Sequence, residues 1–249
     1  MKTIVTCGDS WMTPVPDPVY KGTHFSEIIA SRLNCNLKVF SMMGMSNGGT
    51  VVGIDSAINM NPKPSLVLVN STVPSRIEWP ITKESKVDDV TVYNMLYWNT
   101  YSISSFDPEF NNNPQFLAYS VKEIVSDQIY HFTNPDPHKQ NRLNALTEYV
   151  TWLYNDKLKQ FTDNYMLYGA FHRLLDSKIP FVVVYDYNNI HSMTSWLEEG
   201  KNYAFKTISG FDYQNRKDFK DPGYHTSVAC QEKIAELLLN VNLPNLGVY

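Results

Sequence analysis

Two serines in this sequence have the surroundings of a nucleophile. Ser10 ends the opening run MKTIVTCGDS, and Ser46 lies in GMSNGG, a literal match to the G-x-S-x-G pattern of a strand-to-helix elbow. A serine hydroxyl is a weak nucleophile, so it needs a neighbouring base that a third group orients. The best base is His225 in KDPGYHTS, because it lies on a predicted loop directly before a predicted helix that can hold it rigidly.

These groups allow two arrangements. In the first, Ser10 is the nucleophile, His225 the base and Asp221, four residues earlier, the orienting carboxylate. In the second, Ser46 is the nucleophile, with Asp186 as the acid and His225 again as the base. The elbow of the α/β-hydrolases follows several strands and needs an HGGG-type oxyanion loop upstream. Only two predicted strands precede Ser46 and no such loop is present, which favours Ser10.

The hydrophobic pattern predicts alternating strands and helices. Short apolar runs predict buried strands, and apolar residues at helical spacing predict helices between them. This order is typical of a parallel sheet with helices on both faces, where ligands bind beyond the carboxyl ends of the strands. Ser10, Gly44 and Asn70 each lie at or just beyond such a predicted end. The predicted strands are 3–7, 37–43, 65–71 and 179–186, and the predicted helices are 25–33, 51–60, 142–177 and 226–241.

The middle of the chain has a different character. From about 79 to 140 it is rich in aromatic residues, Asn and Pro, and no strand–helix alternation restarts there. We therefore expect one α/β domain, 1–249, that carries an insertion over its functional edge, with a helix at 117–132. Aromatic side chains stack on the faces of sugar rings, but core packing or a subunit interface explains them equally well.

The composition excludes several classes of protein. The chain has 249 residues, 43% hydrophobic and 18% charged, with a net charge of −4. This balance, without a basic run, disfavours nucleic-acid binding. No apolar stretch is long enough for a signal peptide or a membrane span, so we expect a cytoplasmic protein, or a virion protein if a phage encodes it. The three cysteines are expected to be free thiols, no cofactor or metal is required, and no oligomeric state is predicted.

The motifs resemble those of a known family. CGDSW after the first strand, Gly44 after the second and His225 before the last helix are similar to the SGNH (GDSL) hydrolases. The runs GMSNGGTVVGI and LVLVNSTVPSRIEW resemble a divergent branch that is common in phage and bacterial genomes. The resemblance covers 3–12, 39–54, 65–79 and 219–238. It implies a flavodoxin-like three-layer α/β/α sandwich and an esterase or lipase activity, often on acylated carbohydrates.

The resemblance also implies roles for single residues. Ser10 is the nucleophile, His225 the base and Asp221 the acid, and the backbone N–H groups of Ser10 and Gly44 bind the oxyanion. Ser46 becomes a turn residue. The sequence departs from the family pattern at two points. The Asp–His spacing is four instead of three, which makes Asp218 the reserve acid. In addition, NSTVPSR replaces the Gly-x-Asn-Asp block.

This altered block moves the expected oxyanion donor. Asn70 lies earlier than the family's asparagine, so either Thr72, Ser75 or Arg76 substitutes for it or binds substrate, or the oxyanion hole is only partly built and the enzyme is weak. Asn47 is expected either to reach the oxyanion or to cap the helix that begins near Gly48, with capping favoured. Asp9 is expected to brace the loop, and His24 and His172 are assigned no function.

The sequence thus predicts an esterase that removes acyl groups, acetyl groups in particular, from a small-molecule or polysaccharide ester. The alternative is a non-catalytic structural or glycan-binding phage particle protein with a degenerate site. The altered third block favours this alternative, whereas the presence of both Ser10 and His225 opposes it.

Overall fold

The computed structural model contains a four-stranded parallel sheet in the order β2-β1-β3-β6. The strands are β1 (Thr3–Gly8), β2 (Asn36–Ser41), β3 (Leu66–Asn70) and β6 (Phe181–Tyr185). The residues that the structure describes are 2–15, 18–41, 45–72, 76–80, 98–102, 144, 148–149, 152–185 and 228–243.

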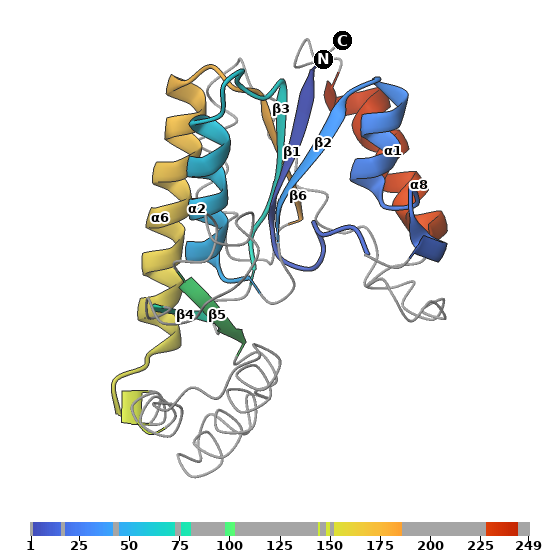
Figure 1. Cartoon of the computed structure of the whole chain (residues 1–249). Helices are drawn as coiled ribbons and strands as arrows, with labels where there is room; N and C mark the ends of the chain where they lie inside the picture. Colours follow the sequence, from blue (N-terminus) through green and yellow to red (C-terminus); the bar gives the residue numbers. More distant parts are fainter. Residues whose placement is uncertain are drawn as a thin grey trace.

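Helices cover both faces of this sheet (Figure 1). One face is covered by α1 (Phe25–Arg32) and α8 (Val228–Leu237), which contact each other, and the other by the contacting pair α2 (Asn47–Ile58) and α6 (Asp156–Asp176). A 3₁₀ turn at Pro18–Tyr20 precedes α1, and a π-helical turn at Leu238–Asn242 continues α8. The predicted three-layer α/β/α architecture is confirmed.

The strand β3 shows why this sequence folds in three layers. All five of its residues are buried, because a strand inside a parallel sheet has helices on both faces. Side chains alternate between the faces of a strand. Accordingly, Val67 and Val69 pack into the core beneath α2 and α6, and Leu66 and Leu68 into the core beneath α1 and α8.

The connections create a topological switch point between the carboxyl ends of β1 and β3. The chain passes from β1 to β2 through α1 on one face, and from β2 to β3 through α2 on the other. The order of the strands therefore changes direction between β1 and β3, and open α/β sheets bind their ligands at this kind of point. The residues that follow β1 and β3 are Asp9, Ser10, Ser71 and Thr72.

The boundaries of the predicted helices needed correction. The helix expected at 51–60 begins at Asn47, because the side chain of Ser46 caps it and the two glycines that follow do not interrupt it. The helical stretch expected at 142–177, in one or two pieces, appears in part as α6, which begins after its N-cap Asn155. Residues 144, 148, 149 and 152, which precede α6, are also helical. The predictions at 25–33 and 226–241 agree with α1 and with α8 and its π-helical continuation.

A separate antiparallel pair of strands, which the sequence did not predict, lies at the start of the expected insertion and within it. The strands β4 (Arg76–Pro80) and β5 (Trp98–Ser102) pair with Trp79 opposite Asn99, and β4 contacts α2. The remainder of the insertion, including the helix expected at 117–132, lies outside the described residues. The single-domain assignment therefore stays a prediction.

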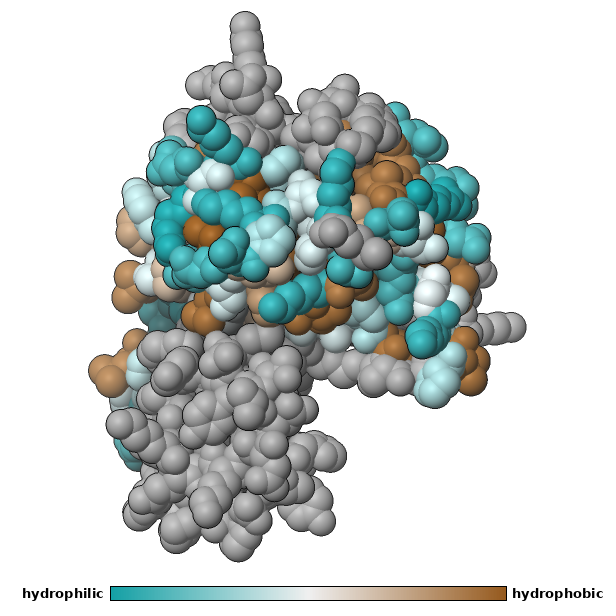
Figure 2. Space-filling view, turned by 45° about the horizontal axis from the view of Figure 1, so that its top comes forward, coloured by the Kyte–Doolittle hydropathy of each residue, from teal (hydrophilic) through white to brown (hydrophobic). Residues whose placement is uncertain are grey.

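The described surface is mostly hydrophilic in the view of Figure 2, with hydrophobic side chains along the edge on which α6 lies in Figure 1. The exposed large hydrophobic residues of α6 are Leu158, Phe161 and Tyr165. Among the helices that the structure describes, none is long and apolar enough to cross a membrane. None of the three cysteines forms a disulfide, so all three are thiols as predicted, and burial raises the pKa of Cys7.

Candidate functional site

Ser10 lies in a tight turn directly after β1. The N–H of Met12 and the hydroxyl of Thr13 donate to the carbonyl of Asp9, at 3.0 and 2.9 Å, and the N–H of Thr13 donates to the carbonyl of Ser10 at 3.4 Å. Ser10 itself is half-buried, between the buried Asp9 and the half-buried Trp11. The turn therefore places a serine hydroxyl in a fixed backbone at the switch point of the sheet.

The carboxylate of Asp9 organises this turn. It accepts hydrogen bonds from the Trp11 N–H at 3.0 Å, from Asn70 Nδ2 at 2.6 Å and from the Thr72 hydroxyl at 2.9 Å. Asp9 is only 1% exposed, and a buried carboxylate requires such donors. The expected loop-bracing role of Asp9 is confirmed.

Asn70 connects the ends of β1 and β3. Its Oδ1 accepts the N–H of Asp9 at 2.9 Å, while its Nδ2 donates to the carboxylate of the same residue. The amide reaches Asp9 across Gly8, which has a φ of +146°. A Cβ on Gly8 would lie 1.6 Å from Asn70 Oδ1, so only glycine allows this contact.

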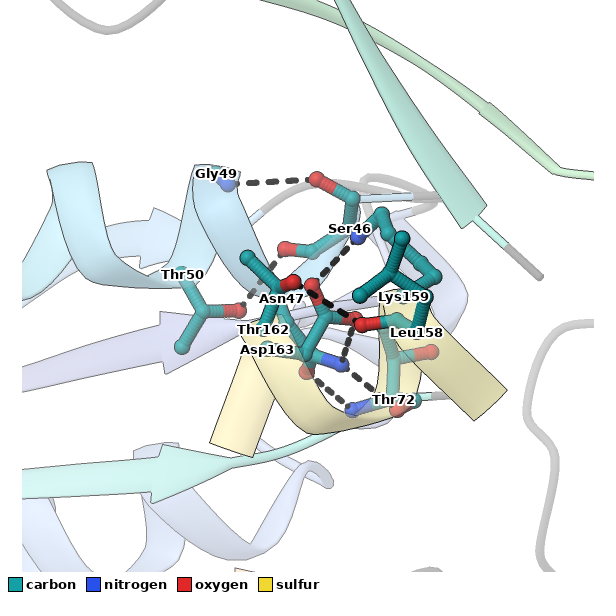
Figure 3. Close-up of polar contacts among 9 residues, drawn as sticks. All are labelled: Ser46, Asn47, Gly49, Thr50, Thr72, Leu158, Lys159, Thr162 and Asp163. Carbon is teal, nitrogen blue, oxygen red and sulfur yellow. Dashed lines mark hydrogen bonds and ion pairs between the residues drawn. The ribbon is translucent and has the colours of Figure 1, made fainter. Parts of the chain in front are cut away.

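Asn47 binds the backbone of Thr72 at two points (Figure 3). Its Oδ1 accepts the Thr72 N–H at 2.8 Å, and its Nδ2 donates to the Thr72 carbonyl at 2.9 Å and to Asp163 Oδ2 at 2.9 Å. The capping role favoured for Asn47 is wrong, since Ser46 is the N-cap and Asn47 the first helical residue. The amide of Asn47 is free to bind Thr72 because the hydroxyl of Ser46 satisfies the helix terminus.

Ser46, the alternative nucleophile, is fully buried. Its Oγ accepts the N–H of Gly49 at 3.2 Å, and its carbonyl accepts hydrogen bonds from the N–H and hydroxyl of Thr50 (Figure 3). A hydroxyl that caps a helix inside the protein is not presented to a substrate. The G-x-S-x-G match thus serves as a helix start in this structure.

His24 supports the turn from the other side. Its Nε2 lies 3.1 Å from the carbonyl of Trp11, which can only accept, so this nitrogen carries the proton. Its Nδ1 accepts the Ser26 N–H at 3.3 Å and caps α1, and Glu27 completes a capping box. Burial lowers the pKa of His24 to about 4, although the hydrogen bond to Trp11 raises it.

The other predicted site residues lie outside the part of the chain that the structure describes in full. Arg76 belongs to β4, of which the structure describes the backbone. Among the described residues, no group of three His, Cys, Asp or Glu side chains could hold a metal ion. The predicted site residues that lie outside the described ranges keep their roles as predictions. They are Gly44, Ser75, Asp186, Asp218, Asp221 and His225.

Sequence reasoning missed two residues that support the turn. His24 carried half of a usable signal, because Glu27 stands at the N3 position of a capping box, although histidine is not one of the usual N-cap residues. Asp163 carried none, since its partner Asn47 lies 116 positions away.

No protein-family model and no curated protein matches the sequence. Among solved structures, the chain is similar to one described as a lipolytic protein of the G-D-S-L family from Desulfitobacterium hafniense DCB-2. The identity is 9% and the TM-score 0.45, over 95% of this chain and 97% of the other.

Two further solved structures are carbohydrate esterases. One is a family two carbohydrate esterase from Clostridium thermocellum in complex with cellohexaose, at 12% identity and a TM-score of 0.43. The other is an acetyl xylan esterase from the rumen bacterium Butyrivibrio proteoclasticus, at 9% identity and a TM-score of 0.43. In both comparisons the similarity extends over 100% of this chain and 65% of the other chain. The family that the sequence motifs resemble is thus among the similar solved structures.

We expect Gly8→Ala to destabilise the protein by about 2–4 kcal/mol, because it combines backbone strain with a clash against Asn70. The matched control is Gly22→Ala, where φ is +83° but nothing lies within 4 Å of the added Cβ, so about 1 kcal/mol is expected. Urea unfolding measures both values. Equal losses in the two variants would contradict the close approach of Asn70.

We expect the buried His24 to make the protein less stable in acid. Its pKa is about 4 in the folded chain and 6.5 in the unfolded chain, so the unfolded chain binds the proton more tightly. The contribution of the neutral His24 imidazole to the free energy of unfolding is complete above pH 6.5. It is lost as the pH falls towards 4, by about 3 kcal/mol in total. Urea unfolding at pH 7 and pH 4.5 measures it, and His24→Asn should lose about 2–3 kcal/mol less between these pH values than the wild type. An identical loss in both proteins would contradict the neutral, buried imidazole.

Proposed function

We propose that this protein is a serine ester hydrolase whose nucleophile is Ser10. One observation carries the proposal: Ser10 follows β1 at the switch point of the sheet, in a turn that the buried Asp9 and Asn70 hold. A nucleophile must stay within a fraction of an ångström of its productive position, and a rigid backbone turn supplies this. The second serine, Ser46, is buried as a helix cap and does not compete.

The mechanism follows from the groups that the sequence motifs supply. His225 takes the proton of Ser10 as its Oγ attacks the acyl carbon, and Asp221, with Asp218 in reserve, orients the imidazole. The backbone N–H groups of Ser10 and Gly44 stabilise the oxyanion. The alcohol leaves with the proton from His225, and a water that His225 activates then releases the acid from the acyl-enzyme.

Asn47, Asn70 and Thr72 have a supporting role in this proposal. Their polar groups bind Asp9 or one another, which favours positioning of the turn over direct donation to the oxyanion. Ser71, between two of them, is buried, and its Oγ has no hydrogen-bond partner within the described ranges. That hydroxyl is therefore a candidate donor to the substrate, together with Arg76.

The proposed substrate is an acylated carbohydrate, with acetyl as the first acyl group to test. The support is the resemblance of the motifs around Ser10, Gly44 and His225 to the SGNH hydrolases, together with the aromatic residues of the insertion. The second candidate function is a non-catalytic glycan-binding or structural protein, including a phage particle protein. One observation favours it, since the amide of Asn70, the asparagine nearest to the altered third block, is bound to Asp9 and is therefore not presented as an oxyanion donor.

We expect Ser10→Ala to reduce ester hydrolysis to the background rate, a loss on the order of 10⁴–10⁶ for a nucleophile. Hydrolysis of p-nitrophenyl acetate and release of acetate from acetylated xylan measure it. Ser46→Ala is the matched control, because it should keep the activity while losing about 0.5–2 kcal/mol of stability with its cap.

The outcomes separate the hypotheses. Loss of activity in Ser46→Ala but not in Ser10→Ala overturns the assignment of the nucleophile. A wild-type protein that hydrolyses neither ester but binds xylan or cello-oligosaccharides in calorimetry supports the non-catalytic alternative.

A further inference from the structure

A buried carboxylate on α6 is connected by hydrogen bonds to the turn that carries Ser10. Asp163 is 1% exposed and forms an ion pair with Lys159, one helical turn earlier, as well as a hydrogen bond with Asn47 Nδ2 at 2.9 Å. A carboxylate in the interior lowers stability unless it is paired and hydrogen-bonded, as it is here. Asp163 is therefore held in a fixed position against Asn47, the first residue of α2.

Asp163 fixes the orientation of the Asn47 amide. A carboxylate accepts hydrogen bonds and cannot donate them, so the NH₂ group of Asn47 must face Asp163. The same orientation directs Oδ1 of Asn47 to the N–H of Thr72, at 2.8 Å. If the amide turned over, its oxygen would face a carboxylate and a carbonyl, and its NH₂ group would face an N–H.

Thr72 transmits this constraint to Asp9. Asn47 holds both the N–H and the carbonyl of Thr72, and the Thr72 hydroxyl donates to Asp9 Oδ2 at 2.9 Å. Asp9 is the residue before Ser10, and its carboxylate also holds the N–H of Trp11, the residue after it. A continuous path of hydrogen bonds therefore runs from α6 through Asn47 and Thr72 to the backbone on both sides of Ser10.

We infer that Asp163 is a positioning residue for the Ser10 turn and acts through Asn47 and Thr72. The effect of Asp163 on catalysis rests on the proposed function of Ser10. The effect of Asp163 on the backbone of the turn does not, since the rigidity of the turn can be measured without a substrate.

The test compares Asp163→Ala with Asp163→Asn. The alanine variant removes the acceptor that orients Asn47, whereas the asparagine variant keeps an amide oxygen that can accept from Asn47 Nδ2. Asn47→Ala and the double variant Asn47→Ala/Asp163→Ala complete a cycle. If Asp163 acts through Asn47, the double variant is no worse than the more severe single variant.

Asp55→Ala is the matched control. Asp55 pairs with Arg173, so it is also a carboxylate that links α2 and α6, but this pair is exposed and has no connection to Asp9 in the described part of the chain. Asp55→Ala should therefore leave the turn and the activity unchanged.

The first readout is amide hydrogen exchange of a peptide that contains residues 9–13, with the α1 peptide as an internal reference. We expect exchange of the turn to be at least about tenfold faster in Asp163→Ala, and close to wild type in Asp163→Asn and Asp55→Ala. The second readout is steady-state kinetics, where kcat should fall about 10–100-fold in Asp163→Ala with KM within about twofold.

Hydrogen exchange and kinetics together distinguish a failure of the inference about Asp163 from a failure of the proposed function. Asp163→Ala with the exchange and kcat of Asp55→Ala overturns the inference and leaves the proposed function intact. A wild-type protein without esterase activity, together with faster exchange in Asp163→Ala, overturns the proposed function and supports the connection between Asp163 and the turn. Faster exchange in the α1 peptide to the same degree as in the turn also overturns the inference, because the effect would then be global.

Discussion

The structure of the candidate site depends on the burial of one carboxylate, that of Asp9. A charged group away from water is stable only if donors surround it, and here they come from its own turn and from the end of β3. Hydrogen bonds to charged groups each contribute about 1.5–3 kcal/mol, so the set is strong enough to hold the turn in one conformation. The same bonds tie β1 to β3 beyond their last paired residues, at the switch point of the sheet.

The layers on both faces of the sheet brace this turn. From one layer, the imidazole that caps α1 donates to the carbonyl of Trp11. From the other, the carboxylate of Asp163 on α6 orients Asn47, the first residue of α2, and Asn47 holds the backbone of Thr72 (Figure 3). The hydroxyl of Thr72 in turn donates to Asp9. The residue between Asp9 and Trp11 is Ser10, so its backbone is fixed through its neighbours. Buried polar networks of this kind specify one arrangement because a misplaced partner leaves a charge or an amide unsatisfied.

Much of the architecture could be predicted because its signals are local. Buried strands such as LVLVN are continuous apolar runs, and the order of strands and helices is sufficient to indicate a parallel sheet with helices on both faces. The position of Ser10 beyond β1 follows from the same pattern. The start of α2 was missed because helix propensity argues against a start at NGG, whereas the cap from Ser46 outweighs it. The paired strands β4 and β5 were missed because antiparallel pairing of short segments across an intervening stretch leaves little periodic signal.

The sequence by itself determined the three-layer fold and the residue that follows the first strand, and it favoured Ser10 over Ser46 as the proposed nucleophile. Only the tertiary structure decided what holds Ser10. It showed that the Asn70 amide binds Asp9 across Gly8 and that Asn47 binds the backbone of Thr72 while Ser46 caps the helix. It also showed that the carboxylate of Asp163 accepts a hydrogen bond from Asn47. The physical reason is that a side-chain amide or carboxylate can bind any donor or acceptor that folding brings near it. Its partner is fixed by the packing of α2 against α6 and of β1 beside β3, and not by its neighbours in the chain.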